Sequence, residues 1–225
     1  MTLAARLSAI DEQIADAARA AGRDAGDITR IVVTKFHPAS LVSDLAALGV
    51  TDVGENRQQE LTAKRADLEE VPVRWHFIGQ AQTNKAAAIR RSADVVHSVD
   101  RDRLADALHR AAESDAVLDV LVQINLTQDA GRGGVAPDGA LALADHIAAL
   151  PSLRLRGVMA VAPLDEEPAA AFARLRSVAD AVRAQHPDAS WISAGMTADF
   201  AQAIAAGATH LRIGSAITGP RPARG

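Results

Sequence analysis

A lysine ends the first run of β-branched residues. The stretch "ITRIVVTKFHPAS", Ile28 to Ser40, places Lys35 directly after Ile-Val-Val-Thr, with Pro38 three residues later. A lysine at a strand end is ordinarily a solvated surface charge, because lysine is rarely buried without a partner. A neutral amine is also a nucleophile that forms a Schiff base with an aldehyde, and partial shielding from water favours that form.

Two segments near the C-terminus combine small residues with hydroxyls. The segment "SAGMT" begins at Ser193 and precedes an expected helix, and "RIGS" ends in Gly214 and Ser215. Backbone N–H groups at a helix start, together with a serine hydroxyl, form a natural anion site. Tight turns rich in Gly and Ser are the alternative interpretation of either segment alone.

Together, these features favour a phosphorylated aldehyde as ligand. A phosphate held at the two segments would bring an aldehyde to Lys35, and pyridoxal 5′-phosphate fits that description. Arg212 suits its ring nitrogen, since a guanidinium keeps its proton and would weaken the ring as an electron sink.

Eight β-rich runs alternate with Ala-rich helical segments and would position these residues. Such alternation predicts a parallel sheet covered by helices, and eight repeats favour a closed (β/α)8 TIM barrel over an open doubly wound sheet. The expected strands are 30–35, 50–55, 74–79, 94–99, 118–126, 155–161, 190–195 and 210–217. The expected helices between them are 38–49, 56–70, 84–92, 101–113, 138–150, 166–186 and 197–207.

The chain ends and helix boundaries complete the expected organisation. Residues 1–225 are expected to form a single domain, with a leading helix at 2–22 and a frayed tail at 220–225. Asn84, Asp100 and Thr197 are candidate N-caps, and Gly49 and Gly207 are candidate helix ends. In a barrel, functional residues lie at the carboxyl ends of strands, where Lys35, Asn56, His76, Asn125 and Arg212 would be found.

Composition excludes several classes of function. The 225 residues carry a net charge of −4 and no cysteine. No basic run indicates nucleic-acid binding, and no run of 18 apolar residues could span a membrane. Arg6, Asp11 and Glu12 interrupt any signal-peptide core. We therefore expect a soluble protein without a thiol nucleophile or thiolate metal site, and the lack of cysteine fits the cytoplasm.

The motifs resemble those of the YggS/PROSC family of pyridoxal phosphate homeostasis proteins. The similarity covers "IVVTK", "GENRQQE", "RWHFIGQAQTNK", "LRGVMAVAP" and "SAGMTADFAQAIAAGATHLRIGSAITG", in family order from near residue 30 to residue 219. It implies the barrel of the alanine racemase N-terminal domain, standing alone as a monomer. It also implies a protein that binds pyridoxal phosphate, buffers it and delivers it to apo PLP-dependent enzymes, without substantial turnover of amino acids.

The resemblance assigns roles to individual residues. Lys35 matches the lysine that forms the Schiff base, and Arg212 the arginine facing the pyridine nitrogen. The positions matching the phosphate-binding turns are Ser193, Gly195, Met196, Gly214 and Ser215. Asn56 matches an asparagine that approaches the cofactor. His76 is expected at the same mouth, although a histidine in a barrel strand is often a satisfied core residue.

Two positions depart from the family pattern. Many relatives have a second lysine where this chain has His37, and a lysine in the loop where it has Arg132. These changes bear on a secondary cofactor site or transfer step rather than on Lys35.

Two enzymatic alternatives stay open at this point. A racemase of this fold needs a second base, which related racemases take from a tyrosine, and this chain has no Tyr. An aldolase of phosphosugars would need a buried acid or base near Lys35, for which Glu55 is the candidate.

Overall fold

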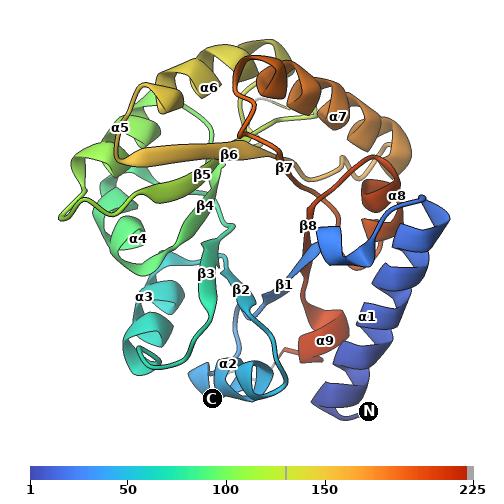
Figure 1. Ribbon diagram of the computed structural model, residues 1–225. Helices are drawn as coiled ribbons and strands as arrows, with labels where there is room; N and C mark the ends of the chain where they lie inside the picture. The colour runs from blue at the N-terminus through green and yellow to red at the C-terminus, as the bar shows by residue number, and fades with distance from the viewer. Residues whose placement is uncertain (130, 222–225) are drawn as a thin grey trace.

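Eight parallel strands form a closed barrel in the computed structural model, which describes residues 1–129 and 131–221. Neighbouring strands pair in chain order, and β1 pairs with β8 from Thr29 opposite His210 to Val32 opposite Ile213 (Figure 1). The predicted barrel is confirmed, and this closure excludes the open sheet. The strands are β1 (Thr29–Val33), β2 (Asp52–Glu55), β3 (Arg74–Phe77), β4 (Val95–Val99), β5 (Leu118–Gln123), β6 (Leu153–Met159), β7 (Trp191–Ser193) and β8 (His210–Ile213).

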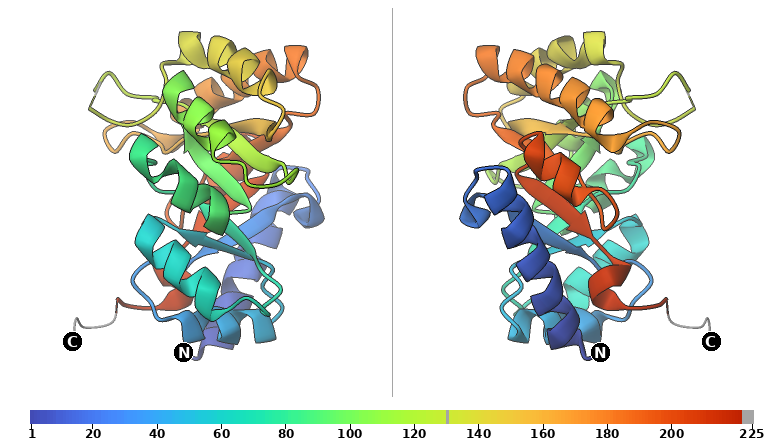
Figure 2. Two further views of the ribbon diagram at one scale, coloured as in Figure 1. Left: turned by 90° about the vertical axis from the view of Figure 1, so that its left-hand side faces the viewer. Right: turned by 90° about the vertical axis from the view of Figure 1, so that its right-hand side faces the viewer.

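Helices surround the barrel, and the two side views in Figure 2 show them packed along its outer wall. They are α1 (Leu3–Ala20), α2 (Ala39–Ala47), α3 (Gln58–Asp67), α4 (Ala86–Ser92), α5 (Asp102–Arg110), α6 (Ala140–Ala148), α7 (Pro168–Gln185), α8 (Phe200–Ala205) and α9 (Ser215–Thr218). Short 3-10 turns lie at Ala25–Asp27, Thr83–Lys85 and Pro137–Gly139. Among the described residues, no helix is both long and apolar enough to cross a membrane.

The predicted helix ends were partly wrong. Asn84 lies within a 3-10 turn, and the capping positions of α4, α5 and α8 are Lys85, Arg101 and Asp199, none of which makes a side-chain cap bond. The predicted glycines are confirmed: Gly49 and Gly207 have φ of 83° and 98°, a conformation that glycine adopts without strain.

One element at the C-terminus differs from its prediction. The expected strand 210–217 stops at Ile213, and α9 forms a single helical turn from Ser215 to Thr218. Gly214, with ψ of −106°, makes the bend between them. This turn matters because it brings Ser215 back over the carboxyl end of β8. The predicted tail at 220–225 extends beyond the described residues.

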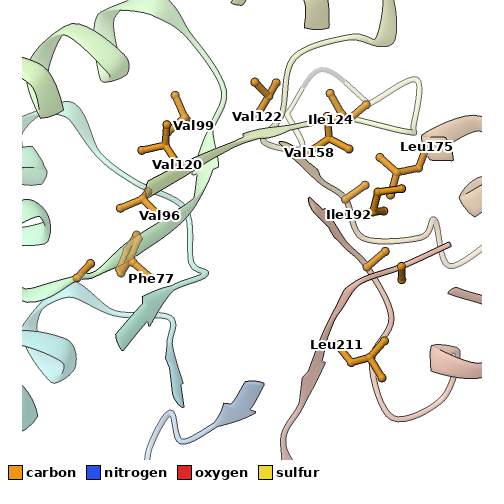
Figure 3. Packing of buried hydrophobic residues seen from close by; sticks show 14 of the residues in the cluster. Phe77, Val96, Val99, Val120, Val122, Ile124, Val158, Leu175, Ile192 and Leu211 are labelled. Atoms are coloured by element: carbon orange, nitrogen blue, oxygen red, sulfur yellow. The ribbon is translucent and has the colours of Figure 1, made fainter. Parts of the chain in front are cut away.

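Apolar side chains fill both surfaces of the strands, as expected when helices cover a parallel sheet. Figure 3 shows the outer layer, in which Val96, Val120 and Val158 from the strands belong to one cluster and Ile192 lies beside Leu175 of α7. The inner layer is smaller and consists of Val95, Leu121 and Met159. The barrel interior therefore leaves room for buried polar residues between β2, β3, β4, β7 and β8.

Candidate cofactor-binding site

A cavity of about 500 Å³ opens at the carboxyl ends of β1, β2 and β8. Six of the nine predicted residues line it: Lys35, Asn56, Met196, Arg212, Gly214 and Ser215. Ser193 is fully buried beneath Arg212. No acidic side chain among the described residues lines the cavity, whereas Lys35, Arg212 and Arg221 do. The site therefore suits an anionic ligand.

The turn that carries Lys35 has an unusual backbone. Phe36 has φ of 69°, a left-handed conformation that is strained for an aromatic residue. The Phe36 N–H donates to Glu60 Oε2 at 2.7 Å, and Lys64 Nζ donates to the Thr34 carbonyl at 2.8 Å. Both side chains come from α3, which therefore holds the turn from below.

A buried ion pair anchors this support. Lys64 Nζ lies 2.5 Å from Glu55 Oε1, and the same oxygen accepts from Thr34 Oγ1 at 2.6 Å. Burial raises the pKa of the Glu55 carboxyl, and the charge of Lys64 opposes that effect. Glu55 Oε1 thus holds Lys64 and Thr34 in place, while Oε2 is buried without a hydrogen-bond partner among the described residues. Glu55 does not line the cavity that contains Lys35, where the acid or base of an aldolase would have to lie.

Lys35 itself is exposed rather than partly shielded. Its Nζ lies 5.9 Å from the centre of the Phe36 ring, and the Arg221 guanidinium lies 3.7 Å from the same ring. His37 lines the cavity beside Lys35, and burial lowers the pKa of its imidazole. The amine is accessible to a ligand and has cationic neighbours.

Backbone donors gather on the opposite side of the cavity. Within the described part of the chain, the N–H groups of Thr197, Ala198, Gly214 and Ser215 have no protein acceptor. The Met196 N–H differs, because it donates to Asp199 Oδ1 at 2.6 Å. The two predicted segments thus supply unpaired donors, as an anion site requires. Met196 lines the site, but its N–H is already bonded to Asp199 and is not one of these donors.

Gly195 shapes the "SAGMT" turn through packing. Its φ is 93°, and a Cβ added there would lie 2.8 Å from the Ala203 Cβ. A side chain would therefore be strained and would push α8 away from the turn. Gly195 positions the donors and does not line the cavity.

Arg212 is buried at the floor of the cavity. It donates to Ser193 Oγ at 2.6 Å and to the Ala160 carbonyl at 2.8 Å, which uses two of its five N–H donors. Burial lowers the pKa of Arg212 to about 10, and the carboxylate of Asp199 opposes that shift. The guanidinium therefore stays charged at neutral pH and keeps donors for a ligand.

Asn56 follows β2 and reaches the cavity wall. Its Oδ1 is buried and has no hydrogen-bond partner among the described residues. Gly79 packs against the Asn56 backbone so closely that a Cβ would lie 1.9 Å from the carbonyl oxygen. An unsatisfied buried amide oxygen of this kind is a ready acceptor for a ligand hydroxyl or N–H.

His76 does not lie at the mouth of the barrel. Its side chain is fully buried, and it contacts His97 at 2.9 Å and Asp52 at 2.8 Å. Asn125 and Arg132 also lie elsewhere, around a separate cavity beside Glu166 and Arg174. The two departures from the family's lysine pattern lie in different places. His37 lines the main cavity, and Arg132 lines the separate one.

Sequence reasoning missed the residues that support the site. Glu60, Lys64 and Asp199 hold the two loops, and Arg221 covers the Phe36 ring. The i, i+4 spacing of Glu60 and Lys64 was a signal that both face one way, but it does not show that this face is buried.

Comparisons with known proteins show the family and the fold. The sequence model of the family described as alanine racemase, N-terminal domain, matches residues 6–222. The pyridoxal phosphate homeostasis protein of Mycobacterium tuberculosis is 40% identical, over 97% of this chain and 92% of the relative. The protein of the same name from Pseudomonas aeruginosa is 39% identical, over 98% and 96%.

A solved structure is similar along nearly its whole length. PipY of Synechococcus elongatus, solved with PLP bound, superposes with a TM-score of 0.84 at 32% identity, covering 96% of this chain and 99% of PipY. The fold and the family match together define a barrel of the racemase N-terminal type. The chain belongs to the family of pyridoxal phosphate homeostasis proteins.

Proposed function

We propose that this protein binds pyridoxal 5′-phosphate (PLP) in the main cavity, holds it on Lys35, and buffers or delivers it within the cytoplasm. The main supporting observation is a set of unpaired donors: the residues from two loops whose backbone N–H groups lack an acceptor also line the cavity. Among the described residues, the lining of this cavity is cationic and contains no acidic side chain. This pattern matches a phosphate ester, which presents several acceptor oxygens and negative charge.

Different residues would contact different parts of the ligand. The N–H groups of Thr197, Ala198, Gly214 and Ser215 would hold the phosphate, while Arg212 would donate to the ring nitrogen. The orphaned Asn56 oxygen would accept from the ligand. When bound, PLP supplies an aldehyde that condenses with a primary amine, and Lys35 presents that amine at the rim.

Storage and delivery are favoured over turnover. The curated relatives are named as homeostasis proteins rather than as enzymes, and PipY was solved with PLP bound. Arg212 stays charged and cannot protonate the ring nitrogen, which weakens the ring as an electron sink. We therefore propose a monomer that releases PLP to apo PLP-dependent enzymes. A racemase-like enzyme is the second candidate, supported by the family match alone.

The test is a titration of the purified protein with PLP, followed by visible absorption. The chain has three lysines, so Lys85→Ala is a matched control for Lys35→Ala. We expect wild type and Lys85→Ala to form the yellow adduct with equal stoichiometry, and folded Lys35→Ala to form none. An adduct that persists in Lys35→Ala would contradict the proposal. Exchange of an amino acid α-proton with solvent, lost in Lys35→Ala, would favour the racemase-like alternative.

A further inference from the structure

A continuous line of hydrogen bonds crosses the inside of the barrel below the cavity. His76 Nε2 lies 2.8 Å from Asp52 Oδ1, and His76 Nδ1 lies 2.9 Å from His97 Nε2. His97 Nδ1 then lies 2.9 Å from Ser193 Oγ, which accepts from Arg212. The line joins β2, β3, β4, β7 and β8, starting from the first residue of β2.

The two ends of the line fix its direction. Arg212 can only donate, so Ser193 Oγ accepts there and has its own proton left for His97 Nδ1. His97 Nδ1 then accepts, so its proton lies on Nε2 and points to His76 Nδ1. By the same step, the His76 proton lies on Nε2 and points to the Asp52 carboxylate, which can only accept.

The opposite direction leaves a conflict. If both imidazoles carried the proton on Nδ1, a bare His76 Nε2 would face the Asp52 oxygen, and the Ser193 proton would have no acceptor on this line. Only a doubly protonated His76 would relieve the first conflict. Burial lowers the pKa of both His76 and His97, so the neutral rings are the stable forms.

We propose that Asp52, His76 and His97 are positioning residues that act through Ser193 to hold the Arg212 guanidinium toward the cofactor's ring nitrogen. Arg212 has two acceptors among the described residues, and one of them is the Ser193 oxygen at the end of this line. A Ser193 hydroxyl whose proton is committed to His97 presents its lone pairs to Arg212. His210 stays outside the line, because its Nδ1 contacts Thr209 Oγ1 at 2.8 Å.

Histidine tautomers in the ligand-free protein test the line directly, by ¹⁵N–¹H correlation NMR. We expect the proton on Nε2 in both His76 and His97, with signals assigned from His76→Gln and His97→Gln. In Asp52→Leu the Ser193–Arg212 end still sets the direction, so His97 should keep its Nε2–H form. The His76 Nε2–H loses its acceptor, so its proton signal should move upfield, whereas Asp52→Asn keeps an acceptor and the original signal. An Nδ1–H form in the wild type, or a His76 Nε2–H signal that is unchanged in Asp52→Leu, would overturn the inference.

The effect on the ligand tests the positioning role, which rests on the proposed function. We expect His97→Leu to raise the Kd for PLP about tenfold, on the scale of one hydrogen bond to a charged group, and to shift the absorption band. His97→Gln, which can accept and donate, should restore both. His109→Leu is the matched control, because His109 makes the same contact with Ser152 Oγ at 2.8 Å outside the cavity.

The two proposals fail in different ways. A wild type that binds no PLP would contradict the proposed function, while the tautomers would still decide whether the line exists. A wild type that binds PLP, with Kd and absorption band unchanged in folded His97→Leu, would overturn the positioning role. If His97→Leu does not fold, Asp52→Leu against Asp52→Asn makes the same comparison of Kd and band.

Discussion

Two buried polar networks support the cavity, and they are built on opposite principles. Below Lys35, Glu55 and Lys64 form a charged pair, with side chains 0% and 7% exposed. Below Arg212, His76 and His97 form a line of neutral rings that joins the carboxylate of Asp52 to the guanidinium. The first network holds a strained backbone turn, and the second holds a side chain.

The difference follows from what each network must hold. A turn with φ of 69° at Phe36 needs strong bonds to its backbone, and a charged pair that also binds the Thr34 carbonyl provides them. Arg212 already carries a charge, so a second buried cation beside it would be repelled. Neutral imidazoles can align hydrogen bonds there without adding charge.

Breaking the charged network should have the largest effect. Lys64→Met leaves the Glu55 carboxylate buried with the Thr34 hydroxyl but without its charged partner, which costs about 3–5 kcal/mol of unfolding free energy. Chemical denaturation measures the loss, and Glu55→Gln combined with Lys64→Met should recover part of it. Arg19→Met is the control, because Arg19 pairs with Asp16 on the surface, where a pair is worth under about 1 kcal/mol. Equal losses in the two variants would contradict this account.

The buried neutral histidines should make the folded protein less stable as the pH falls. Burial lowers the pKa of His76, His97 and His210, the last to about 3. The unfolded chain takes up protons below about pH 6.5 and the folded chain does not, so stability is complete above that pH and falls below it. Each ring contributes about 1.4 kcal/mol per pH unit between its two pKa values.

Denaturation at pH 7.5, 6 and 5 measures that slope. His97→Gln should reduce the slope of unfolding free energy against pH by the contribution of one ring. His109→Gln should leave the contribution of His97 unchanged. A free energy of unfolding that stays constant from pH 7.5 to pH 5 would contradict the assignment of three neutral buried rings.

Replacing Ser193 or Ser215 should have the smallest effects of the changes considered. Ser215 is exposed at the cavity rim, whereas Ser193 is buried in the neutral network. Replacing either by Ala should weaken PLP binding by roughly 1–2 kcal/mol, as for hydrogen bonds to charged groups. Only Ser193→Ala should also lower the melting temperature. Unchanged affinity in both variants would show that neither hydroxyl contributes to PLP binding.

The barrel was predictable because its signals are local and repeated. Eight β-rich runs separated by helical segments leave few alternatives, and Lys35 and Arg212 follow from their places just after β1 and within β8. The single turn of α9 was missed because "GSAI" continues an apolar run and only the backbone at Gly214 ends the strand. The helices between the strands start one to three residues later than expected.

The supporting networks could not be predicted from the sequence. A period of two shows that His76 and Trp75 face opposite sides of β3, but it does not show which side is the barrel interior. Lys64 and Glu60 read as surface charges on an amphipathic helix. Their burial depends on how α3 packs under the turn at Lys35, which is a property of the whole fold.

The central claim is that Lys35 holds the cofactor, and peptide mapping after borohydride reduction tests it most directly. The three lysines lie at positions 35, 64 and 85, so their peptides are readily told apart by mass spectrometry. The account predicts the reduced pyridoxyl mass on the peptide carrying Lys35 and none on the other two. A modification confined to Lys64 or Lys85, or a PLP-saturated protein with no modified lysine, would contradict it.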